Sequence, residues 1–257
     1  VYKRQGRDQL STASLACSKN GKIEALRIIT RSNIGAYATG PGAALPPVVG
    51  PKILTSLYHV PSYHLDVSSY LTNTVPMGAY RGAGRPEAIY LMERLVQKTA
   101  EEMGIDSLEF RKRNFIPPDA MPYTSPIGEI YDSGDFEKVL DKAIELSEWN
   151  DFESRKENSQ NKGRIRGRGI SCYIEWTGAI WFEEVTTEAR ADGSVVLYTG
   201  TQNTGQGLKT AFTQLLSQQL ELPVGKIEIV QGDTDLVKGK GSFGSRSLYI
   251  GGSAIKE

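Results

Sequence analysis

Cysteine and histidine are scarce in this sequence of 257 residues, which contains two of each. Cys17 and Cys172 lie far apart and form no Cys-x-x-Cys pair, which argues against a disulfide framework or a thiolate zinc site. Pro61 lies between His59 and His64 and breaks the spacing of a helical metal pair, so we expect packing or surface roles for both histidines. The sequence therefore predicts neither a metal ligated by protein side chains nor a Ser-His-Asp triad.

An excess of charge and a long apolar run are also missing. Thirty basic side chains balance thirty acidic ones, so the formal net charge is zero and nothing in it favours nucleic acid or an anionic membrane. No stretch approaches the roughly 20 apolar residues that cross a bilayer, and no signal pattern opens the chain. We therefore expect a cytoplasmic protein without a membrane span that does not bind nucleic acid.

The two ends of the sequence suggest a piece of a longer protein. The chain begins with Val1 and stops at Glu257, shortly after Gly251-Gly252-Ser253. Ser253 has the character of an N-cap residue that opens a helix. Because a natural protein seldom ends where a helix begins, we expect an internal fragment.

The hydrophobic pattern predicts a mixed α and β protein. Alternating or β-branched runs predict strands at 11–17, 23–31, 58–74, 169–176, 182–191, 194–198 and 226–230. Helical periodicity and capping residues predict helices at 86–103, 106–114, 135–146 and 208–220. These elements favour the α+β class, with mixed sheets and packed helices in two subdomains.

A polar segment divides the predicted elements. Nearly every residue of 150–167 is polar or charged, which indicates an exposed linker. Arg164, Arg166 and Arg168 alternate with other residues and are compatible with RNA contact, but the acidic residues beside them favour a solvated linker. We assign 1–116 to a first subdomain, 117–168 to a connecting helix and linker, and 169–257 to a second subdomain.

Three glycine-rich loops precede predicted helices. The first, 78–86, carries Arg81 and Arg85 and enters the helix at Pro86. Small residues allow close approach of a ligand, and the helix start offers unpaired N–H groups, which together suit a phosphate or carboxylate. A plain glycine turn with two solvated arginines explains this loop equally well.

The second and third loops offer neutral donors. Loop 200–207 reads Gly-Thr-Gln-Asn-Thr-Gly-Gln-Gly and has neither a Walker lysine nor a dinucleotide fingerprint. Loop 239–247 reads Gly-Lys-Gly-Ser-Phe-Gly-Ser-Arg-Ser, in which glycine and serine can form a nest of N–H groups. Either can be an ordinary turn, but three such loops together suggest a large phosphate-bearing ligand.

At these loops the sequence resembles the large, molybdenum-binding subunit of the xanthine dehydrogenase and aldehyde oxidase family, which includes carbon monoxide dehydrogenase large subunits. The resemblance extends from about Gly6 to Glu257. Its most specific motifs are Gly78-Ala79-Tyr80-Arg81-Gly82-Ala83-Gly84-Arg85-Pro86-Glu87, Gly205-Gln206-Gly207, Gln231-Gly232-Asp233-Thr234-Asp235 and Ser242-Phe243-Gly244-Ser245-Arg246-Ser247. It implies that 1–116 and 169–257 are parts of two molybdopterin-binding subdomains.

The resemblance also implies an activity and a cofactor. The expected enzyme is a molybdenum hydroxylase that binds molybdopterin cytosine dinucleotide and oxidises an aldehyde or N-heterocycle with water as oxygen source. Its 2Fe-2S clusters and FAD would lie on partner subunits, in a dimer of heterotrimers, and no protein side chain would ligate molybdenum. Arg81 would be catalytic. The residues assigned to the cofactor are Tyr80, Arg81, Gly82, Gly205, Gln206, Gly207, Ser242, Phe243, Gly244, Ser245, Arg246 and Ser247.

Two departures from the family pattern limit these expectations. The copper-binding cysteine of true carbon monoxide dehydrogenases is missing from the loop at Tyr80-Arg81-Gly82-Ala83-Gly84-Arg85. The family's glutamate base and first glycine loop lie beyond the two ends, so this fragment alone should be inactive.

The alternative function is that of a non-catalytic phosphate- or nucleotide-binding module. If one dinucleotide contacts all three loops, we expect Arg81, Gln206 and Ser245 to face one shared cleft between the two subdomains.

Overall fold

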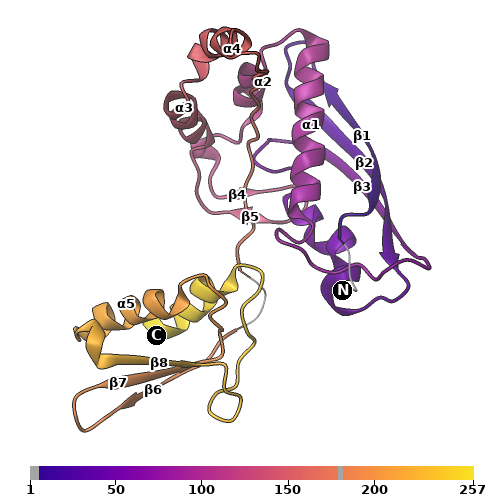
Figure 1. Ribbon diagram of the computed structural model, residues 1–257. Helices are drawn as coiled ribbons and strands as arrows, with labels where there is room; N and C mark the ends of the chain where they lie inside the picture. The colour runs from indigo at the N-terminus through magenta and orange to yellow at the C-terminus, as the bar shows by residue number, and fades with distance from the viewer. Residues whose placement is uncertain (1–5, 179–181) are drawn as a thin grey trace. The chain divides into compact units, whose positions relative to one another are not determined.

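The computed structural model describes residues 6–178 and 182–257, which fall into two compact units. The first unit ends at Glu175 and the second begins at Trp176. Each contains a three-stranded sheet and helices (Figure 1). The predicted α+β class with mixed sheets and packed helices is confirmed.

The sheet of the first unit consists of β1 (Gln9–Cys17), β2 (Ile23–Gly35) and β3 (Ser62–Leu71), with β2 in the centre. β1 and β2 form an antiparallel hairpin, whereas β3 runs parallel to β2. Buried and exposed residues alternate along β2, as expected for a strand with one face on the core. Ile23, Leu26 and Ile28 are almost completely buried and begin this core.

Helix α1 (Arg85–Met103) runs along this sheet (Figure 1). Its buried face includes Met92, Val96 and Ala100, which follow the spacing of one helical side. α2 (Ser107–Asn114) and α3 (Phe136–Leu146) begin at the predicted caps, since the carboxylates of Asp106 and Asp135 accept backbone N–H groups there. A small hairpin of β4 (Tyr123–Thr124) and β5 (Ile130–Tyr131) lies between them in sequence.

Two stretches of the first unit differ from the prediction. Residues 150–167, expected to be an exposed linker, contain the helix α4 (Phe152–Gln160), because Phe152 is buried and the polar residues around it are compatible with a solvated helix. The expected strand at 169–176 is absent from the described residues. In its place the backbone N–H of Cys172 donates to the Glu93 carboxylate at 2.9 Å rather than to a neighbouring strand.

The second unit contains β6 (Val185–Ala189), β7 (Val195–Thr199), α5 (Leu208–Leu220), β8 (Ile227–Gln231) and α6 (Gly252–Lys256). β6 is shorter than the predicted strand 182–191, and the helical turns before α6 begin at Ser247. Ser253 is therefore inside a helix and is not its N-cap, since its hydroxyl donates to Tyr249 O. Helix α5 covers the sheet (Figure 1). The shared core contains Val195, Leu197, Leu208, Phe212, Leu216, Ile229 and Ile255.

Candidate cofactor site

Two of the glycine loops leave the same end of the second sheet. β7 and β8 are parallel neighbours, and α5 connects them. Loop 200–207 follows the carboxyl end of β7, and the chain leading to loop 239–247 follows the carboxyl end of β8. Because the carboxyl ends of parallel strands share one edge, both loops arise on that edge, which is where open α/β sheets bind ligands.

Direct contacts join the two loops. The Ser242 hydroxyl accepts the Gln202 N–H at 2.8 Å and donates to Gln202 O at 2.7 Å. Farther back, a Cβ atom on Gly200 would lie 2.1 Å from the Cα of Gly239. No side chain can be accommodated between backbones so close, so glycine is required at this crossing.

A cavity of about 390 Å³ lies where the loops meet. The polar side chains in its wall are neutral donors and acceptors, and the apolar ones come from α5, from the turns before α6 and from Phe243 of loop 239–247. Its lining consists of Thr204, Gln206, Leu208, Ala211, Ser242, Phe243, Gly244, Ser245, Ser247 and Leu248. Such a wall suits a ligand with many polar edges and a phosphate that is bound mainly by N–H and O–H groups.

The amide of Gln206 shapes its own loop. Its Oε1 accepts the Thr204 N–H at 2.5 Å, and its Nε2 donates to Gln202 O at 2.9 Å. An amide nitrogen carries two hydrogens, so one donor remains after this bond. Gln206 thus both closes the loop and lines the cavity.

Glycines leave the backbone of this edge accessible. Gly205 and Gly207 have φ of 105° and 80°, and an added Cβ at either would meet nothing within 4 Å. Gly207 is also the N-cap of α5 and provides no side chain to satisfy the first N–H groups of that helix. These N–H groups, with the positive end of the helix dipole, favour an anion.

Loop 239–247, the serine-rich loop, has side chains both in the cavity wall and in the protein interior. Ser242, Ser245 and Ser247 line the cavity, and the half-exposed ring of Phe243 lies beside them. Arg246, in contrast, is fully buried, and its Nη1 lies 2.6 Å from Glu183 Oε2. The structure therefore places this arginine behind the loop rather than in the cavity wall.

The first glycine loop belongs to the first unit and begins α1. Gly82, Ala83 and Gly84 have consecutive positive φ values of 90°, 48° and 90°, and Gly84 is the N-cap of α1 without a capping side chain. Tyr80 and Arg81 are exposed, and the side chain of Arg7 donates to Arg81 O at 2.5 Å. The loop thus presents Tyr80, Arg81 and an uncapped helix start.

The second arginine of this loop is not solvated. Arg85 is only 4% exposed, and its Nε lies 2.8 Å from Glu175 Oε1. Glu175 is the last residue of the first unit, so this ion pair ties the end of that unit to the start of α1. The loop is therefore more than a glycine turn with two free arginines.

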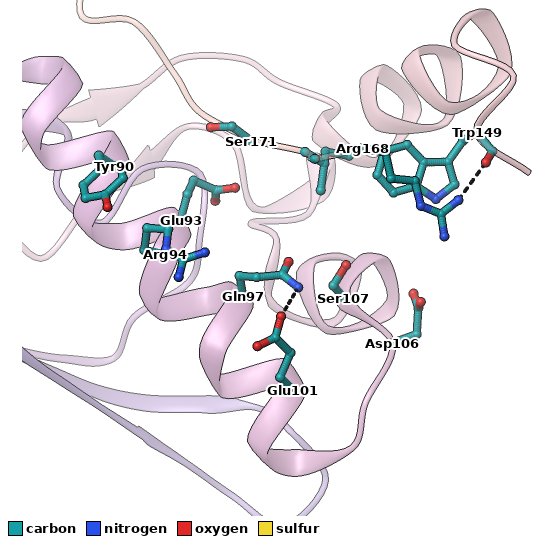
Figure 2. Close-up of a pocket in the computed structure, with 12 residues that line it drawn as sticks. Tyr90, Glu93, Arg94, Gln97, Glu101, Asp106, Ser107, Trp149, Arg168 and Ser171 are labelled. Carbon is teal, nitrogen blue, oxygen red and sulfur yellow. Dashed lines mark hydrogen bonds between the residues drawn. The ribbon is translucent and has the colours of Figure 1, made fainter. Parts of the chain in front are cut away.

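A second cavity, of about 540 Å³, lies in the first unit between α1, α2 and residues 168–171 (Figure 2). Two of its charged groups, Arg168 and Glu93, have partners within the unit. Arg168 stacks on Trp149 with its Cζ 4.6 Å from the ring centroid, and it also donates to Trp149 O. The buried carboxylate of Glu93 accepts from both Nε and Nη2 of Arg111, at 3.2 and 3.1 Å. Without a glycine loop in its wall, this cavity suits the cofactor less well.

Two groups close to Glu93, the Cys172 thiol and the Tyr58 hydroxyl, have raised pKa values. Burial, followed by the negative charge of Glu93, raises the pKa of the Cys172 thiol to about 11. Burial and Glu93 also hold the pKa of Tyr58 well above its usual range, and the Tyr58 hydroxyl donates to Glu93. Both groups are neutral at pH 7.

Two other kinds of feature are absent from the described residues. Among residues 6–178 and 182–257, no group of three or more His, Cys, Asp or Glu side chains is placed to hold a metal ion. His59 and His64 are both exposed and therefore lie at the protein surface. In the same part of the chain, no helix has the length and apolar character that a membrane crossing requires.

Sequence reasoning missed the partners of the two loop arginines. Glu183 is buried and Glu184 is exposed, and both precede β6. Neither the Glu183–Arg246 pair nor the Arg85–Glu175 pair has a signal in the local pattern. Each joins residues far apart in the chain.

Comparisons with known proteins identify the domains of the chain. Two family models, each described as a molybdopterin cofactor-binding domain, match residues 1–115 and 142–257. The chain is 32% identical over 268 residues to the carbon monoxide dehydrogenase large chain of Afipia carboxidovorans, a match that covers 96% of this chain and 33% of that one. It is 29% identical over 257 residues to the gamma subunit of the 6-hydroxypseudooxynicotine dehydrogenase complex of Paenarthrobacter nicotinovorans, covering 98% and 32% of the two chains.

A solved structure gives the same result. Quinoline 2-oxidoreductase from Pseudomonas putida 86 matches with a TM-score of 0.90 and 25% identity, over 98% of this chain and 34% of that one. The chain thus spans about a third of the length of the curated relatives that it matches. The two family models together cover nearly all of it. The chain belongs to the molybdopterin cofactor-binding domains of the xanthine dehydrogenase and carbon monoxide dehydrogenase family of molybdenum oxidoreductases.

Proposed function

We propose that this chain forms part of the large subunit of a molybdenum hydroxylase and binds molybdopterin cytosine dinucleotide through its glycine loops. The observation that carries the proposal is the cavity where loops 200–207 and 239–247 meet at the carboxyl ends of β7 and β8. Its neutral donors and its open glycines match the polar pterin edges and the phosphates of such a cofactor.

Within this cavity each group has a proposed role. The hydroxyls of Ser242, Ser245 and Ser247 donate to phosphate or cytosine oxygens, and the free N–H of Gln206 binds a pterin or phosphate acceptor. The uncapped N-terminus of α5, at Gly207, adds N–H groups and a positive dipole end for the pyrophosphate. Phe243 contributes apolar surface beside them.

Loop 78–86 of the first unit is proposed to face the molybdenum side. There the exposed guanidinium of Arg81 supplies positive charge beside the reacting atoms, with Tyr80 and the backbone of Gly82 next to it. When bound, the molybdenum cofactor supplies the two-electron oxidation of the substrate, with water as the oxygen source. The chain's own residues supply position and charge.

The proposed substrates are aldehydes or N-heterocycles. Two of the matching proteins, 6-hydroxypseudooxynicotine dehydrogenase and quinoline 2-oxidoreductase, have names that refer to nitrogen-containing compounds. We propose that the electrons leave through 2Fe-2S clusters and FAD on partner subunits, in a dimer of heterotrimers. The gamma-subunit relative belongs to a complex, which supports this arrangement.

Metal and nucleotide analysis of the intact protein that carries this chain tests the proposal. We expect one molybdenum per large subunit, release of cytidine monophosphate on acid hydrolysis, and dye reduction with an aldehyde or N-heterocycle. A protein that retains a nucleotide but contains no molybdenum and reduces no dye would contradict the proposal. That result would favour a non-catalytic nucleotide-binding module.

A further inference from the structure

The guanidinium of Arg246 bonds to three groups and joins two segments of the second unit. It forms a fully buried ion pair with Glu183, in which both side chains are 0% exposed. Its Nη1 also donates to Gly241 O, and its Nη2 donates to Phe182 O, each at 2.8 Å. The first of these bonds closes the serine-rich loop on itself, and the second fastens the loop to the segment before β6.

The loop that this arginine closes has an unfavourable backbone. Gly244 and Ser245 both have left-handed conformations, with φ of 57° and 59°. For a serine this conformation costs roughly 1 kcal/mol or more and persists only where the surroundings enforce it. Ser245 lines the cavity and directly precedes Arg246, so the buried anchor lies beside the strained residue.

Glu183 occupies the crossing of the two loops. A Cβ atom on Gly239 would lie 2.6 Å from Glu183 Oε1, and one on Gly200 would lie 2.9 Å from the same oxygen. The two glycines therefore leave space for both the backbone crossing and the carboxylate. Glu183 is thus in contact with the starts of both loops while it holds Arg246.

Stability alone is a weak reason for such a pair. Removing two charges from water costs several kcal/mol, and replacing a buried ion pair by apolar side chains is often neutral or stabilising. Within residues 6–178 and 182–257, Arg246 Nε and Glu183 Oε1 also have no hydrogen-bond partner, which adds to this cost. A costly arrangement in direct contact with two ligand loops is typical of a device that fixes geometry.

We propose that Glu183 and Arg246 are a positioning pair that holds the serine-rich loop in the shape that binds the cofactor. This inference rests on the proposed function. It changes the role expected of Arg246, which acts through Ser245 and the loop backbone and does not contact the cofactor. Glu183 joins the set of functional residues as its partner.

The variant Arg246→Lys tests the pair in the intact protein. Lysine keeps the charge opposite Glu183, but one ammonium cannot reproduce the fork that reaches Glu183, Gly241 O and Phe182 O together. We expect molybdenum per folded protein to fall about tenfold, consistent with the loss of one or two charge-assisted hydrogen bonds. In cofactor-free protein, cleavage by trypsin after the exposed Lys240 should rise several-fold.

Arg111→Lys is the matched control, because Arg111 is equally buried and paired with Glu93 in the first unit. We expect it to lower the melting temperature without changing molybdenum content or cleavage after Lys240. A purely structural role for Arg246 predicts that its lysine variant behaves like this control. That outcome would overturn the inference.

The double variant Glu183→Met/Arg246→Met separates positioning from folding. Two apolar side chains avoid an unpaired buried charge, so we expect the fold to survive while cofactor retention falls and cleavage after Lys240 rises. Full molybdenum occupancy and wild-type cleavage in this variant would also overturn the inference. Wild-type protein without molybdenum would contradict the proposed function instead, and trypsin cleavage of the cofactor-free variants would still decide whether the pair holds the loop.

Discussion

At the scale of single residues, Gln206 is the side chain whose removal tests the cavity most simply. Gln206→Ala deletes both the loop-closing bonds and the N–H proposed to bind the cofactor. The polar cofactor atoms left unpaired cost on the order of 1–3 kcal/mol, so we expect cofactor retention to drop about tenfold or more. Molybdenum and cytidine nucleotide per folded protein measure this effect. Full occupancy would remove Gln206 from the site.

Gly207 tests the backbone of the same loop. A valine at its φ of 80° is strained, and its side chain would project into space that is open for the ligand. We expect Gly207→Val to lose more cofactor than Gln206→Ala. Gly193→Val is the matched control, because Gly193 has φ of 77° and equally open surroundings in the hairpin between β6 and β7. Equal molybdenum loss in both valine variants would show that strain alone is responsible.

Cys172 provides a test of the first unit that needs no cofactor. With a pKa of about 11, against an ordinary value near 8.5, its thiol contains roughly two hundredfold less thiolate at pH 8. Alkylation by iodoacetamide should therefore be roughly two hundredfold slower than that of a free cysteine peptide, and should accelerate up to about pH 11. Because the folded-state pKa is raised, the thiol's contribution to stability is present below pH 8.5 and is lost as the pH rises toward 11. Peptide-like alkylation at pH 8 would contradict the buried Cys172–Glu93 contact.

At the scale of elements, the sequence predicted best where the local pattern decides the structure. α1 has a clear apolar stripe, and α2 and α3 begin at the aspartate caps expected from the sequence. The prediction failed at 169–176, because an alternating pattern cannot show whether a partner strand exists. It failed at α4 because a solvated helix and a solvated linker have the same polar composition.

The site could be predicted only in part for a related reason. Each glycine loop is recognisable from its own residues, since glycine and serine before a helix indicate backbone donors. The crossing of Gly200 and Gly239 and the partners of Arg85 and Arg246 depend on tertiary contacts. No local pattern contains that information.

The first glycine loop leads to a prediction about copper. The segment Tyr80–Arg85 contains no cysteine, and copper(I) prefers sulfur ligands. We therefore expect the intact protein to bind no stoichiometric copper and to oxidise no carbon monoxide, although it matches a carbon monoxide dehydrogenase large chain. Metal analysis together with a carbon monoxide oxidation assay checks this expectation. Stoichiometric copper with carbon monoxide oxidation would prove it wrong.

At the scale of the whole molecule, we predict that one ligand contacts both units. The first unit provides Arg81 at the start of α1, and the second provides the cavity with Gln206 and Ser245. A dinucleotide cofactor has a metal end and a nucleotide end, so one molecule can engage a loop from each unit. We predict that Arg81 lies toward the metal end, and Gln206 and Ser245 toward the pterin and phosphates.

A crystal structure of the intact protein with its cofactor tests this prediction directly. We expect one molybdopterin cytosine dinucleotide in contact with Arg81, Gln206 and Ser245, with Arg246 behind the loop and bonded to Glu183. A cofactor bound elsewhere, or glycine loops on opposite surfaces with no common ligand, would contradict it.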